Sequence, residues 1–249
     1  MMADDDYLEA ADSTRDDTYD YDDVQFAVRL TDVSRVYRMG SNKIEALRNI
    51  NLEIEPGQYV VVSGHSGSGK TTLLNVIGAI DVPSSGRLLV MDVPISDYDE
   101  SFRATFRLTT TGFIFQSYNL VSTLTALENV MFPMQMYDKT PDEIEEVAMN
   151  LLARVKMDHR PDHLPWQLSS GEQQRVAIAR AMANDPPIIL ADEPTANLDG
   201  ESGQMIRELL SELNAEGKTV VVMTHDEGII GHKNARRFTM ENGELKSNV

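Results

Sequence analysis

Residues 64–71 read G-H-S-G-S-G-K-T, which matches the phosphate-binding pattern G-x-x-x-x-G-K-[ST] in full. The pattern lies between an apolar, strand-like run at 59–63 and a helix-like run at 72–77, the context that it requires. Its glycines allow backbone N–H groups to curl around phosphate oxygens at a helix N-terminus. Lys70 could then reach the β- and γ-phosphates of a nucleotide, and the Thr71 hydroxyl could bind Mg²⁺. A chance match in a glycine- and serine-rich turn is the alternative.

A second candidate site is the pair of carboxylates that ends the apolar run I-I-L-A-D-E at 188–193. Neighbouring side chains on a strand point to opposite faces, so the sequence predicts different roles for Asp192 and Glu193. We assign Asp192 to Mg²⁺, directly or through water, and Glu193 to the water that attacks the γ-phosphate. An N-cap turn made of Asp-Glu-Pro is the alternative, and the phosphate loop upstream argues against it.

Between these motifs, residues 168–181 read L-S-S-G-E-Q-Q-R-V-A-I-A-R-A. This segment resembles the signature motif of ATP-binding-cassette (ABC) ATPases, usually written L-S-G-G-Q. Residues 192–199, D-E-P-T-A-N-L-D, resemble the Walker B motif and D-loop of the same family. The resemblance covers about residues 25–246. It implies an α/β P-loop NTPase core with an antiparallel β-subdomain and an inserted helical subdomain.

The resemblance also assigns roles to three single residues. Gln116, after G-F-I-F, is similar to the Q-loop glutamine, which ligates Mg²⁺ and reports nucleotide occupancy to a transport partner. His225, in V-M-T-H-D, is similar to the switch histidine that contacts the γ-phosphate. Tyr37 lies where the family places the aromatic residue that stacks on adenine. The alternatives are a surface amide for Gln116, a generic loop histidine for His225 and strand packing for Tyr37.

The signature motif implies a dimer, because in the family it reaches the γ-phosphate bound by a second, head-to-tail copy of the ATPase. The Ser169 hydroxyl and the Gly171 backbone N–H would make that contact, although a plain N-cap explains Ser169 equally well. Ser170 stands where glycine is usual. If that position needs a left-handed backbone or a very close approach, serine costs about 1 kcal/mol. Glu172 in place of glutamine and Ala196 in the D-loop are milder departures.

The predicted site thus binds ATP as substrate and Mg²⁺ as cofactor. The catalytic residues are Lys70, Gln116, Glu193 and His225. The metal ligands are Thr71, Gln116 and Asp192. The nucleotide-binding residues are Tyr37, Gly64, His65, Ser66, Gly67, Ser68, Gly69, Lys70, Thr71, Thr72, Ser169, Gly171 and Asp199.

The elements that position these residues follow from hydrophobic periodicity. Strands are predicted at 26–31, 50–54, 59–63, 87–91, 111–115, 188–190 and 219–223. Helices are predicted after the phosphate loop, within 126–157, at 172–183 and at 202–215. Strands that alternate with helices imply a parallel sheet covered on both faces. The helical stretch at about 117–183 is predicted to be an insert between two halves of that sheet, with Trp166 packed inside it.

Composition limits the class of protein further. Of the formal net charge of −18 in 249 residues, half belongs to residues 1–23, which carry ten carboxylates and one arginine. We therefore expect a disordered acidic tail at 1–23 and an ATPase domain at 24–249. The acidic surplus argues against nucleic-acid binding. Since the sequence has no cysteine and no apolar run that could span a membrane, we expect a cytosolic chain that meets a membrane only through another chain.

Four segments narrow the group, because they are similar to the ATPase subunits of lipoprotein-releasing and macrolide-export transporters. These segments are 38–47, 112–120, 124–130 and 157–160. The similarity implies an integral membrane permease of the FtsX-like or macrolide-exporter type, docked near residues 116–137, and a peripheral location on the cytoplasmic face of the inner membrane. Met131, Met134 and Met136 would give the docking region an adaptable apolar surface, and core packing explains them nearly as well.

Other functions were weighed on the same residues. A cell-division ATPase of the same branch, which signals through its permease to a cell-wall hydrolase, would carry the same catalytic residues and stays an alternative. A ribosome-acting cassette protein normally has two cassettes and basic linkers, and a DNA-repair cassette has a long coiled coil before its signature motif. The sequence has neither feature. An inactive scaffold is disfavoured because Lys70, Asp192, Glu193 and His225 are all present.

Overall fold

The computed structural model describes residues 24–40, 42–137 and 139–247, so the predicted acidic tail at 1–23 lies outside the described residues. The strands are β1 (Val28–Met39), β2 (Asn42–Ile54), β3 (Tyr59–Ser63), β4 (Ser85–Val90), β5 (Thr111–Ile114), β6 (Ile188–Asp192), β7 (Thr219–Met223), β8 (Ala235–Glu241) and β9 (Glu244–Ser247). The α-helices are α1 (Lys70–Ile77), α2 (Glu100–Thr110), α3 (Ala126–Met131), α4 (Pro141–Arg154), α5 (Ser170–Ala181), α6 (Gly200–Ala215) and α7 (Glu227–Ile230). Short 3-10 helices are η3 (Ile95–Asp97), η4 (Phe132–Met136) and η5 (Pro165–Gln167). Within the described ranges, no helix has both the length and the apolar character needed to cross a bilayer.

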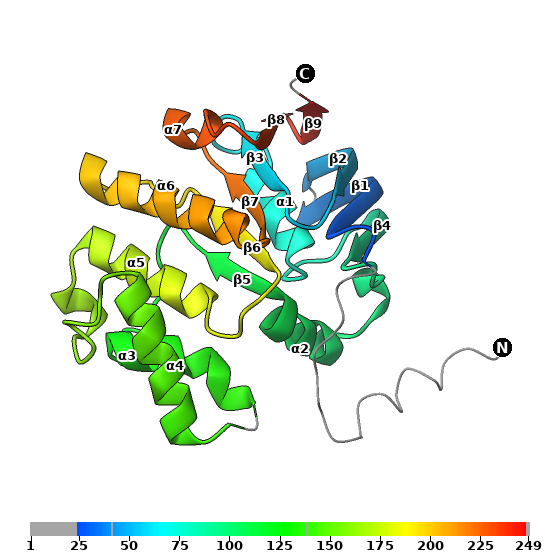
Figure 1. Ribbon diagram of the computed structural model, residues 1–249. Helices are drawn as coiled ribbons and strands as arrows, with labels where there is room; N and C mark the ends of the chain where they lie inside the picture. Colours follow the sequence, from blue (N-terminus) through cyan, green and yellow to red (C-terminus); the bar gives the residue numbers. More distant parts are fainter. Residues whose placement is uncertain (1–23, 41, 138, 248–249) are drawn as a thin grey trace.

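Two sheets organise these elements (Figure 1). The larger sheet has the strand order β5-β6-β7-β3-β8-β9, and the smaller sheet has the order β2-β1-β4. In the larger sheet the strands β5, β6, β7, β3 and β8 run parallel, and β9 pairs antiparallel with β8. The smaller sheet is antiparallel throughout. The predicted α/β fold with a parallel main sheet and a separate antiparallel sheet is confirmed.

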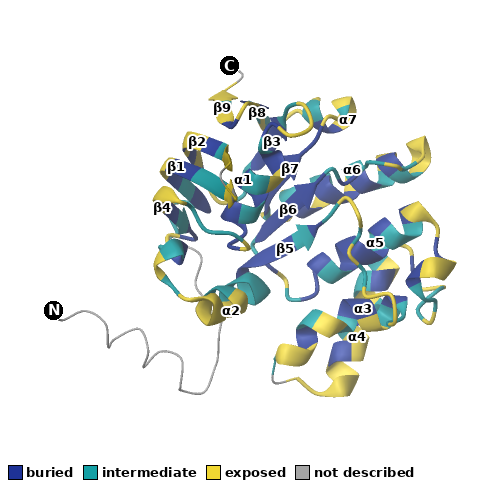
Figure 2. Ribbon diagram, turned by 180° about the vertical axis from the view of Figure 1, so that it is seen from behind, coloured by how far each residue is buried: buried dark blue, intermediate teal, exposed yellow. Residues whose placement is uncertain are grey.

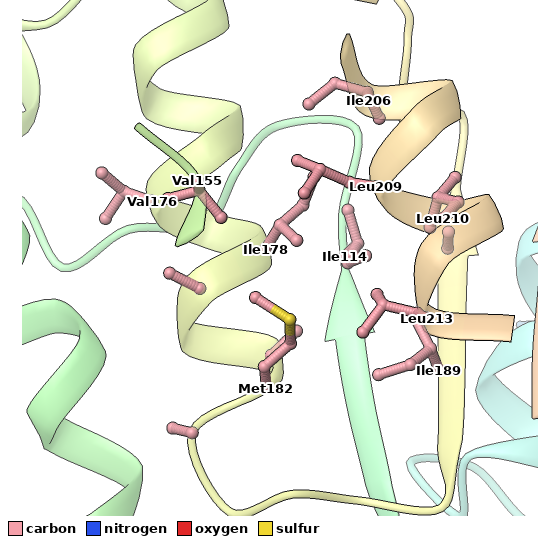
Figure 3. Close-up of a cluster of buried hydrophobic side chains, with 14 of the residues drawn as sticks. Ile114, Val155, Val176, Ile178, Met182, Ile189, Ile206, Leu209, Leu210 and Leu213 are labelled. Atoms are coloured by element: carbon pink, nitrogen blue, oxygen red, sulfur yellow. The ribbon is translucent and has the colours of Figure 1, made fainter. Parts of the chain in front are cut away.

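The central strands β6 and β7 of the larger sheet are buried on both faces. On β7, Val220 and Val222 belong to one apolar cluster and Val221 and Met223 to another, because side chains alternate along a strand. The first cluster lies between the sheet and the helices α5 and α6 (Figure 3), and the second between the sheet, α1 and the smaller sheet. Burial on both faces (Figure 2) explains why β6 and β7 read as continuous apolar runs.

The first two strands are much longer than the predicted strands at 26–31 and 50–54. They form a hairpin in which Tyr37 pairs with Ile44 and Arg38 with Lys43. At the tip of this hairpin, residues 42–45 of β2 are all exposed, so this part shows no alternation of buried and exposed residues. Helix α2 and the β8–β9 hairpin were not predicted.

The helical insert required two corrections. Strands β5 and β6 are neighbours, with β5 at the edge, so α3, α4 and α5 are inserted at the edge of the sheet and not between two halves of it (Figure 1). Trp166, predicted to pack inside the insert, is 74% exposed.

Candidate active site

The phosphate loop connects β3 to α1 in a conformation that favours glycine. Gly64, Gly67 and Gly69 have φ angles of 146°, 77° and 115°, in the region that other residues rarely adopt. A Cβ atom on Gly64 would lie 2.3 Å from the carbonyl oxygen of Met240, and one on Gly69 would lie 2.6 Å from that of Ala46. The loop is therefore an open cradle of backbone ahead of α1, a shape that suits phosphate oxygens.

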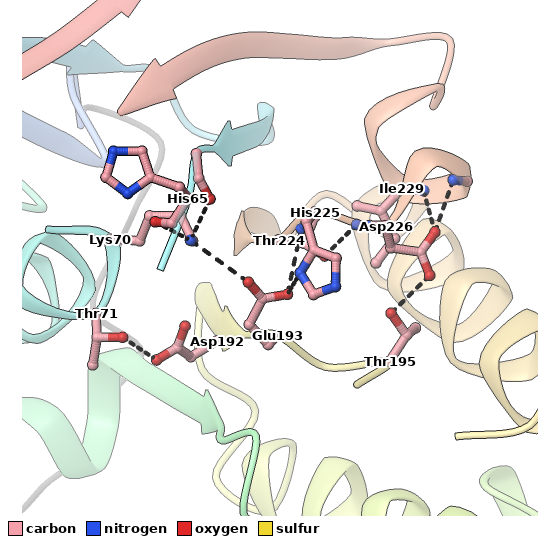
Figure 4. A network of polar contacts seen from close by, with 12 residues as sticks. His65, Lys70, Thr71, Asp192, Glu193, Thr195, Thr224, His225, Asp226 and Ile229 are labelled. Atoms are coloured by element: carbon pink, nitrogen blue, oxygen red, sulfur yellow. Dashed lines mark hydrogen bonds and ion pairs between the residues drawn. The ribbon is translucent and has the colours of Figure 1, made fainter. Parts of the chain in front are cut away.

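Lys70 folds back over this loop. Its Nζ donates to the carbonyl oxygens of Gly64 at 2.7 Å and His65 at 3.2 Å, and lies 3.7 Å from Oε1 of Glu193 (Figure 4). The side chain is only 9% exposed, so its charge is fixed at the rim of the cradle. A phosphate held in the loop would meet this ammonium group and the backbone amides together.

Thr71 and Asp192 face each other from α1 and β6. Thr71 Oγ1 donates to Asp192 Oδ2 at 2.7 Å. Burial raises the pKa of Asp192 above its ordinary value, and the bond from Thr71 offsets part of that rise. A hydroxyl and a carboxylate suit Mg²⁺, which usually takes one or two protein ligands besides phosphate and water. Elsewhere in the described chain, no group of three or more His, Cys, Asp or Glu side chains could hold a metal ion.

Glu193 is not part of the strand that precedes it. β6 ends at Asp192, and Glu193 has a φ angle of 47°, in the left-handed region. Its backbone N–H donates to the carbonyl oxygen of Met223 at 2.8 Å, which holds this turn against β7. The two carboxylates have different partners, and their different roles stay a prediction. The argument from side chains that alternate along a strand was wrong, because the strand ends at Asp192 and the backbone turns at Glu193.

Glu193 joins Lys70 to His225. Oε2 of Glu193 lies 2.9 Å from Nδ1 of His225 and accepts the His225 backbone N–H at 3.3 Å (Figure 4). The Glu193 side chain is 13% exposed, whereas that of His225 is 78% exposed. A carboxylate that can accept a proton is thus held beside an imidazole that reaches into open space.

Most of the predicted residues line one polar cavity of about 680 Å³. The predicted residues in its lining are Gly64, His65, Ser66, Gly67, Gly69, Lys70, Thr71, Thr72, Gln116, Asp192, Glu193 and His225. Ser68 lies behind the loop, 1% exposed, with its backbone N–H donating to the His65 carbonyl at 3.3 Å. The remaining lining was not predicted, since it comes from the distant strand β2 and the β8–β9 turn. These residues are Ile44, Glu45, Ala46, Arg48, Asn242 and Gly243.

Tyr37 lies outside the lining that the described residues give this cavity. Its hydroxyl donates to Oδ2 of Asp81 at 2.6 Å, and the Arg35 guanidinium lies 4.6 Å from the ring centre. Its strand partner Ile44 does line the cavity. Stacking of Tyr37 on adenine stays a prediction, and it would require the ring to exchange these contacts for the base.

The signature residues are separate from the cavity in the described part of this single copy. Ser169 caps α5, where its Oγ accepts the Glu172 N–H at 3.3 Å and the Glu172 carboxylate accepts the Ser169 N–H at 2.8 Å. A Cβ atom on Gly171 would lie 2.5 Å from Oγ of Ser202, so glycine allows α5 to approach α6 closely. Asp199 caps α6 and accepts the Ser202 N–H at 2.8 Å.

Ser170 causes no backbone strain. It is the first residue of α5, is exposed, and is absent from the residues with positive φ angles in the described chain. The left-handed backbone considered for this position is therefore absent, and with it that source of the cost of about 1 kcal/mol. The close approach falls on the neighbouring Gly171 instead.

Sequence reasoning missed a network around Asp226. Oδ2 of Asp226 accepts from Thr195 Oγ1 at 2.8 Å and from Arg207 Nη1 at 2.9 Å, and Oδ1 accepts the N–H groups of two residues of α7 (Figure 4). The network ties the loop after Glu193 to the loop that carries His225. The one indication in the sequence was the aspartate directly after His225, to which we assigned no role.

A comparison with family models establishes the class of protein. Residues 47–196 match the model described as ABC transporter. The chain belongs to this family, as an ABC ATPase subunit that binds and hydrolyses ATP.

Individual relatives support the same family. The ABC transporter ATP-binding protein MJ0796 of Methanocaldococcus jannaschii is 43% identical over 224 residues, covering 88% of this chain and 95% of that protein. Its dimeric structure in a post-hydrolysis state, bound to ADP and Pi, has a TM-score of 0.83 to this chain at 42% identity and covers 88% of this chain and 98% of that one. The lipoprotein-releasing system ATP-binding protein LolD of Idiomarina loihiensis is 44% identical over 200 residues, 80% of this chain and 88% of LolD. The macrolide export protein MacB of Hyphomonas neptunium is 44% identical over 202 residues, 81% of this chain and 31% of MacB.

We expect Asp192→Asn to abolish hydrolysis and to raise the melting temperature of the nucleotide-free protein. Because burial raises the pKa of Asp192 in the folded state, its ionised form is less stable there than in the unfolded chain. That cost is present above the folded pKa and is absent below the unfolded one. Calorimetry should therefore show a higher melting temperature than the wild type near pH 7 and no gain near pH 3. A lower melting temperature near pH 7 would contradict the electrostatic account.

Proposed function

We propose that this chain binds ATP between two of its own copies and that closure of this dimer drives a separate membrane permease. The shared site is supported by the position of the predicted residues, some of which line the cavity while others lie away from it. The cavity holds Lys70, Asp192, Glu193 and His225, whereas Ser169, at the start of α5, lies outside the lining formed by the described residues. A head-to-tail second copy would supply its signature turn to the open side of the cavity, and solved structures of MJ0796 are described as dimeric.

In the proposed reaction, Glu193 orients a water molecule and takes its proton as the water oxygen attacks the γ-phosphorus. The bond from the γ-phosphorus to the bridging oxygen breaks, and ADP keeps that oxygen. Lys70 neutralises the β- and γ-phosphate oxygens, and His225 holds Glu193 at 2.9 Å while its ring reaches the γ-phosphate. Thr71, Asp192 and Gln116 would hold Mg²⁺, which would neutralise part of the phosphate charge when bound.

A second cavity of about 370 Å³ fits the proposed permease contact, and we call it the α2–α5 groove. Its lining combines apolar side chains with arginine and asparagine. These residues are Ile80, Ala104, Arg107, Leu108, Thr111, Gly112, Phe113, Phe115, Asn119, Pro133, Arg180, Ala181, Asn184 and Pro186. η4 contributes Pro133 to the groove and also presents two exposed apolar side chains, Phe132 (54%) and Met136 (78%). Of the three methionines considered for docking, Met134 is fully buried and Met131 half-buried, so only Met136 is a surface residue.

Charge placed on this surface should weaken the permease complex without altering the isolated enzyme. We expect Phe132→Asp with Met136→Asp to lower recovery of the ATPase with the co-expressed membrane subunit at least about tenfold, as for loss of an apolar hot spot. Basal ATPase activity should stay unchanged. Trp166→Asp is the matched control, because Trp166 is also exposed. It precedes the N-terminal end of α5, whereas the groove lies at the C-terminal end of that helix. Equal loss with the control, or full recovery of the double variant, would contradict this docking site.

The type of permease is a separate proposal, which rests on the similarity to LolD and MacB. We propose a lipoprotein-release or macrolide-export type of permease with few membrane spans and a large extracytoplasmic domain. The ATPase would then lie on the cytoplasmic face of the inner membrane. The cell-division type is the second candidate, since it would use the same site. The reading frame beside this gene is expected to encode such a permease, and a many-spanning importer there would refute the assignment.

A further inference from the structure

Gln116 lies on a tight turn that borders both cavities. β5 ends at Ile114, and Gln116 and Ser117 are exposed beyond it. The turn is closed by the Tyr118 N–H, which donates to the Phe115 carbonyl at 3.1 Å. Gln116 lines the nucleotide cavity, whereas Phe115 and Asn119 line the α2–α5 groove. A small shift of this turn would therefore move the Gln116 side chain relative to a bound nucleotide.

The turn is strained and is held from outside. Tyr118 and Asn119 have φ angles of 59° and 50°, two consecutive residues other than glycine in the left-handed region. The left-handed region is unfavourable for a bulky residue such as Tyr118, less so for asparagine, and the conformation persists where neighbouring groups impose it. Arg180 supplies the constraint, because its Nη2 donates to the Tyr118 carbonyl at 2.8 Å and its Nη1 to the Asn119 carbonyl at 2.6 Å.

Arg180 makes these bonds as a half-buried cation near the C-terminal end of α5. Burial lowers the pKa of its guanidinium, and no ion pair with a carboxylate is found for it in the described part of the chain. Arg107, which lines the same groove, has Glu100 as an ion partner at 2.6 Å. Arg180 has no carboxylate partner among the described residues, and both of its Nη atoms donate to the same turn. Its position therefore suits holding the turn and not balancing a negative charge.

We propose that Arg180 is a positioning residue for Gln116. The inference rests on the proposed contact of Gln116 with the Mg²⁺–nucleotide. α5 is one continuous helix that begins with the signature turn and ends beside Arg180. Through Arg180, any displacement of α5 is passed to the turn and to Gln116. The signature turn and Gln116 thus move as one body, which couples dimer closure to the metal site.

Hydrogen exchange of the nucleotide-free protein tests the clamp without reference to activity. In Arg180→Met, amides at 115–121 should exchange at least about tenfold faster than in the wild type, because the strained turn opens more often. In Arg180→Lys, which can reach one carbonyl, the exchange rate of these amides should lie between those of the wild type and Arg180→Met. This variant replaces Arg180→Met in the test if the methionine variant does not fold. Asn184→Ala is the matched control, since Asn184 lines the same groove and binds the Leu108 and Pro133 carbonyls. Unchanged exchange in both arginine variants would overturn the proposal.

A double-mutant cycle tests whether Arg180 acts through Gln116. We expect Arg180→Met to lower kcat about tenfold and to raise the Mg²⁺ concentration for half-maximal activity, and to add less than about twofold in a Gln116→Ala background. If Gln116→Ala lowers kcat and Arg180→Met lowers it by a further factor of about ten in that background, the inference fails while the role of Gln116 stands. If Gln116→Ala alone changes nothing, the proposed role of Gln116 fails, and the inference fails with it.

Discussion

Glu193→Gln is expected to lower kcat by about 10³-fold while the affinity for ATP changes by less than about threefold. Glutamine keeps the size of the side chain and its hydrogen bonds, but it cannot take a proton from the attacking water. The structure places this carboxylate 2.9 Å from His225 and 3.7 Å from Lys70, between the two groups that would face the γ-phosphate. Single-turnover hydrolysis of labelled ATP, with binding measured separately, gives both quantities.

Glu227→Gln is the matched control for this experiment. Glu227 is exposed, lies two residues after His225 and forms the first turn of α7, and it is absent from the lining that the described residues give the cavity. Its replacement should leave kcat within about twofold of the wild type. Turnover close to wild type in Glu193→Gln would show that another group accepts the proton.

Lys70→Met should strongly weaken the binding of ATP. Lys70 is the buried cation of the phosphate loop, and charge-assisted hydrogen bonds contribute about 1.5–3 kcal/mol each. Loss of two such bonds predicts a Kd higher by about 10²-fold or more. Titration with a fluorescent ATP analogue measures this loss directly and does not depend on turnover.

Lys218→Met controls for the loss of one positive charge from the whole molecule. Lys218 pairs with Asp185, and its side chain is 19% exposed, so the two lysines are comparable in size and partial burial. Its replacement should change the Kd for ATP by less than about twofold. An equal loss of affinity in both variants would assign the effect to net charge or folding and not to the phosphate loop.

The chemistry of the site could be predicted from the sequence because its residues belong to short contiguous motifs. The loop at 64–71 follows β3 and the acids at 192–193 lie at the end of β6, and these parallel strands, with β7 between them, bring both groups to one edge of the sheet. The conformation of Glu193 could not be predicted in this way. Its left-handed backbone depends on a bond to Met223 of the neighbouring strand, a contact between residues far apart in the sequence.

Elements whose burial depends on distant partners were the ones that sequence reasoning missed. The tip of the β1–β2 hairpin pairs exposed residues, such as Arg38 with Lys43, so hydrophobic periodicity gave no indication of its length. Trp166 was expected to be buried because of its residue type, but η5 leaves it at the surface. Tyr37 was placed by its resemblance alone, and its hydrogen bond to Asp81 depends on the turn after α1.

The central claim, that nucleotide is held between two copies of this chain, is tested most directly by the molar mass of Glu193→Gln with ATP and Mg²⁺. Light scattering after gel filtration should give the 27.8 kDa monomer without nucleotide and about twice that mass with ATP. Adding Ser169→Arg, which places a bulky side chain at the signature turn, should return the mass to that of the monomer. A protein that binds ATP at one site per chain and yet stays at 27.8 kDa at every concentration tested would contradict the account.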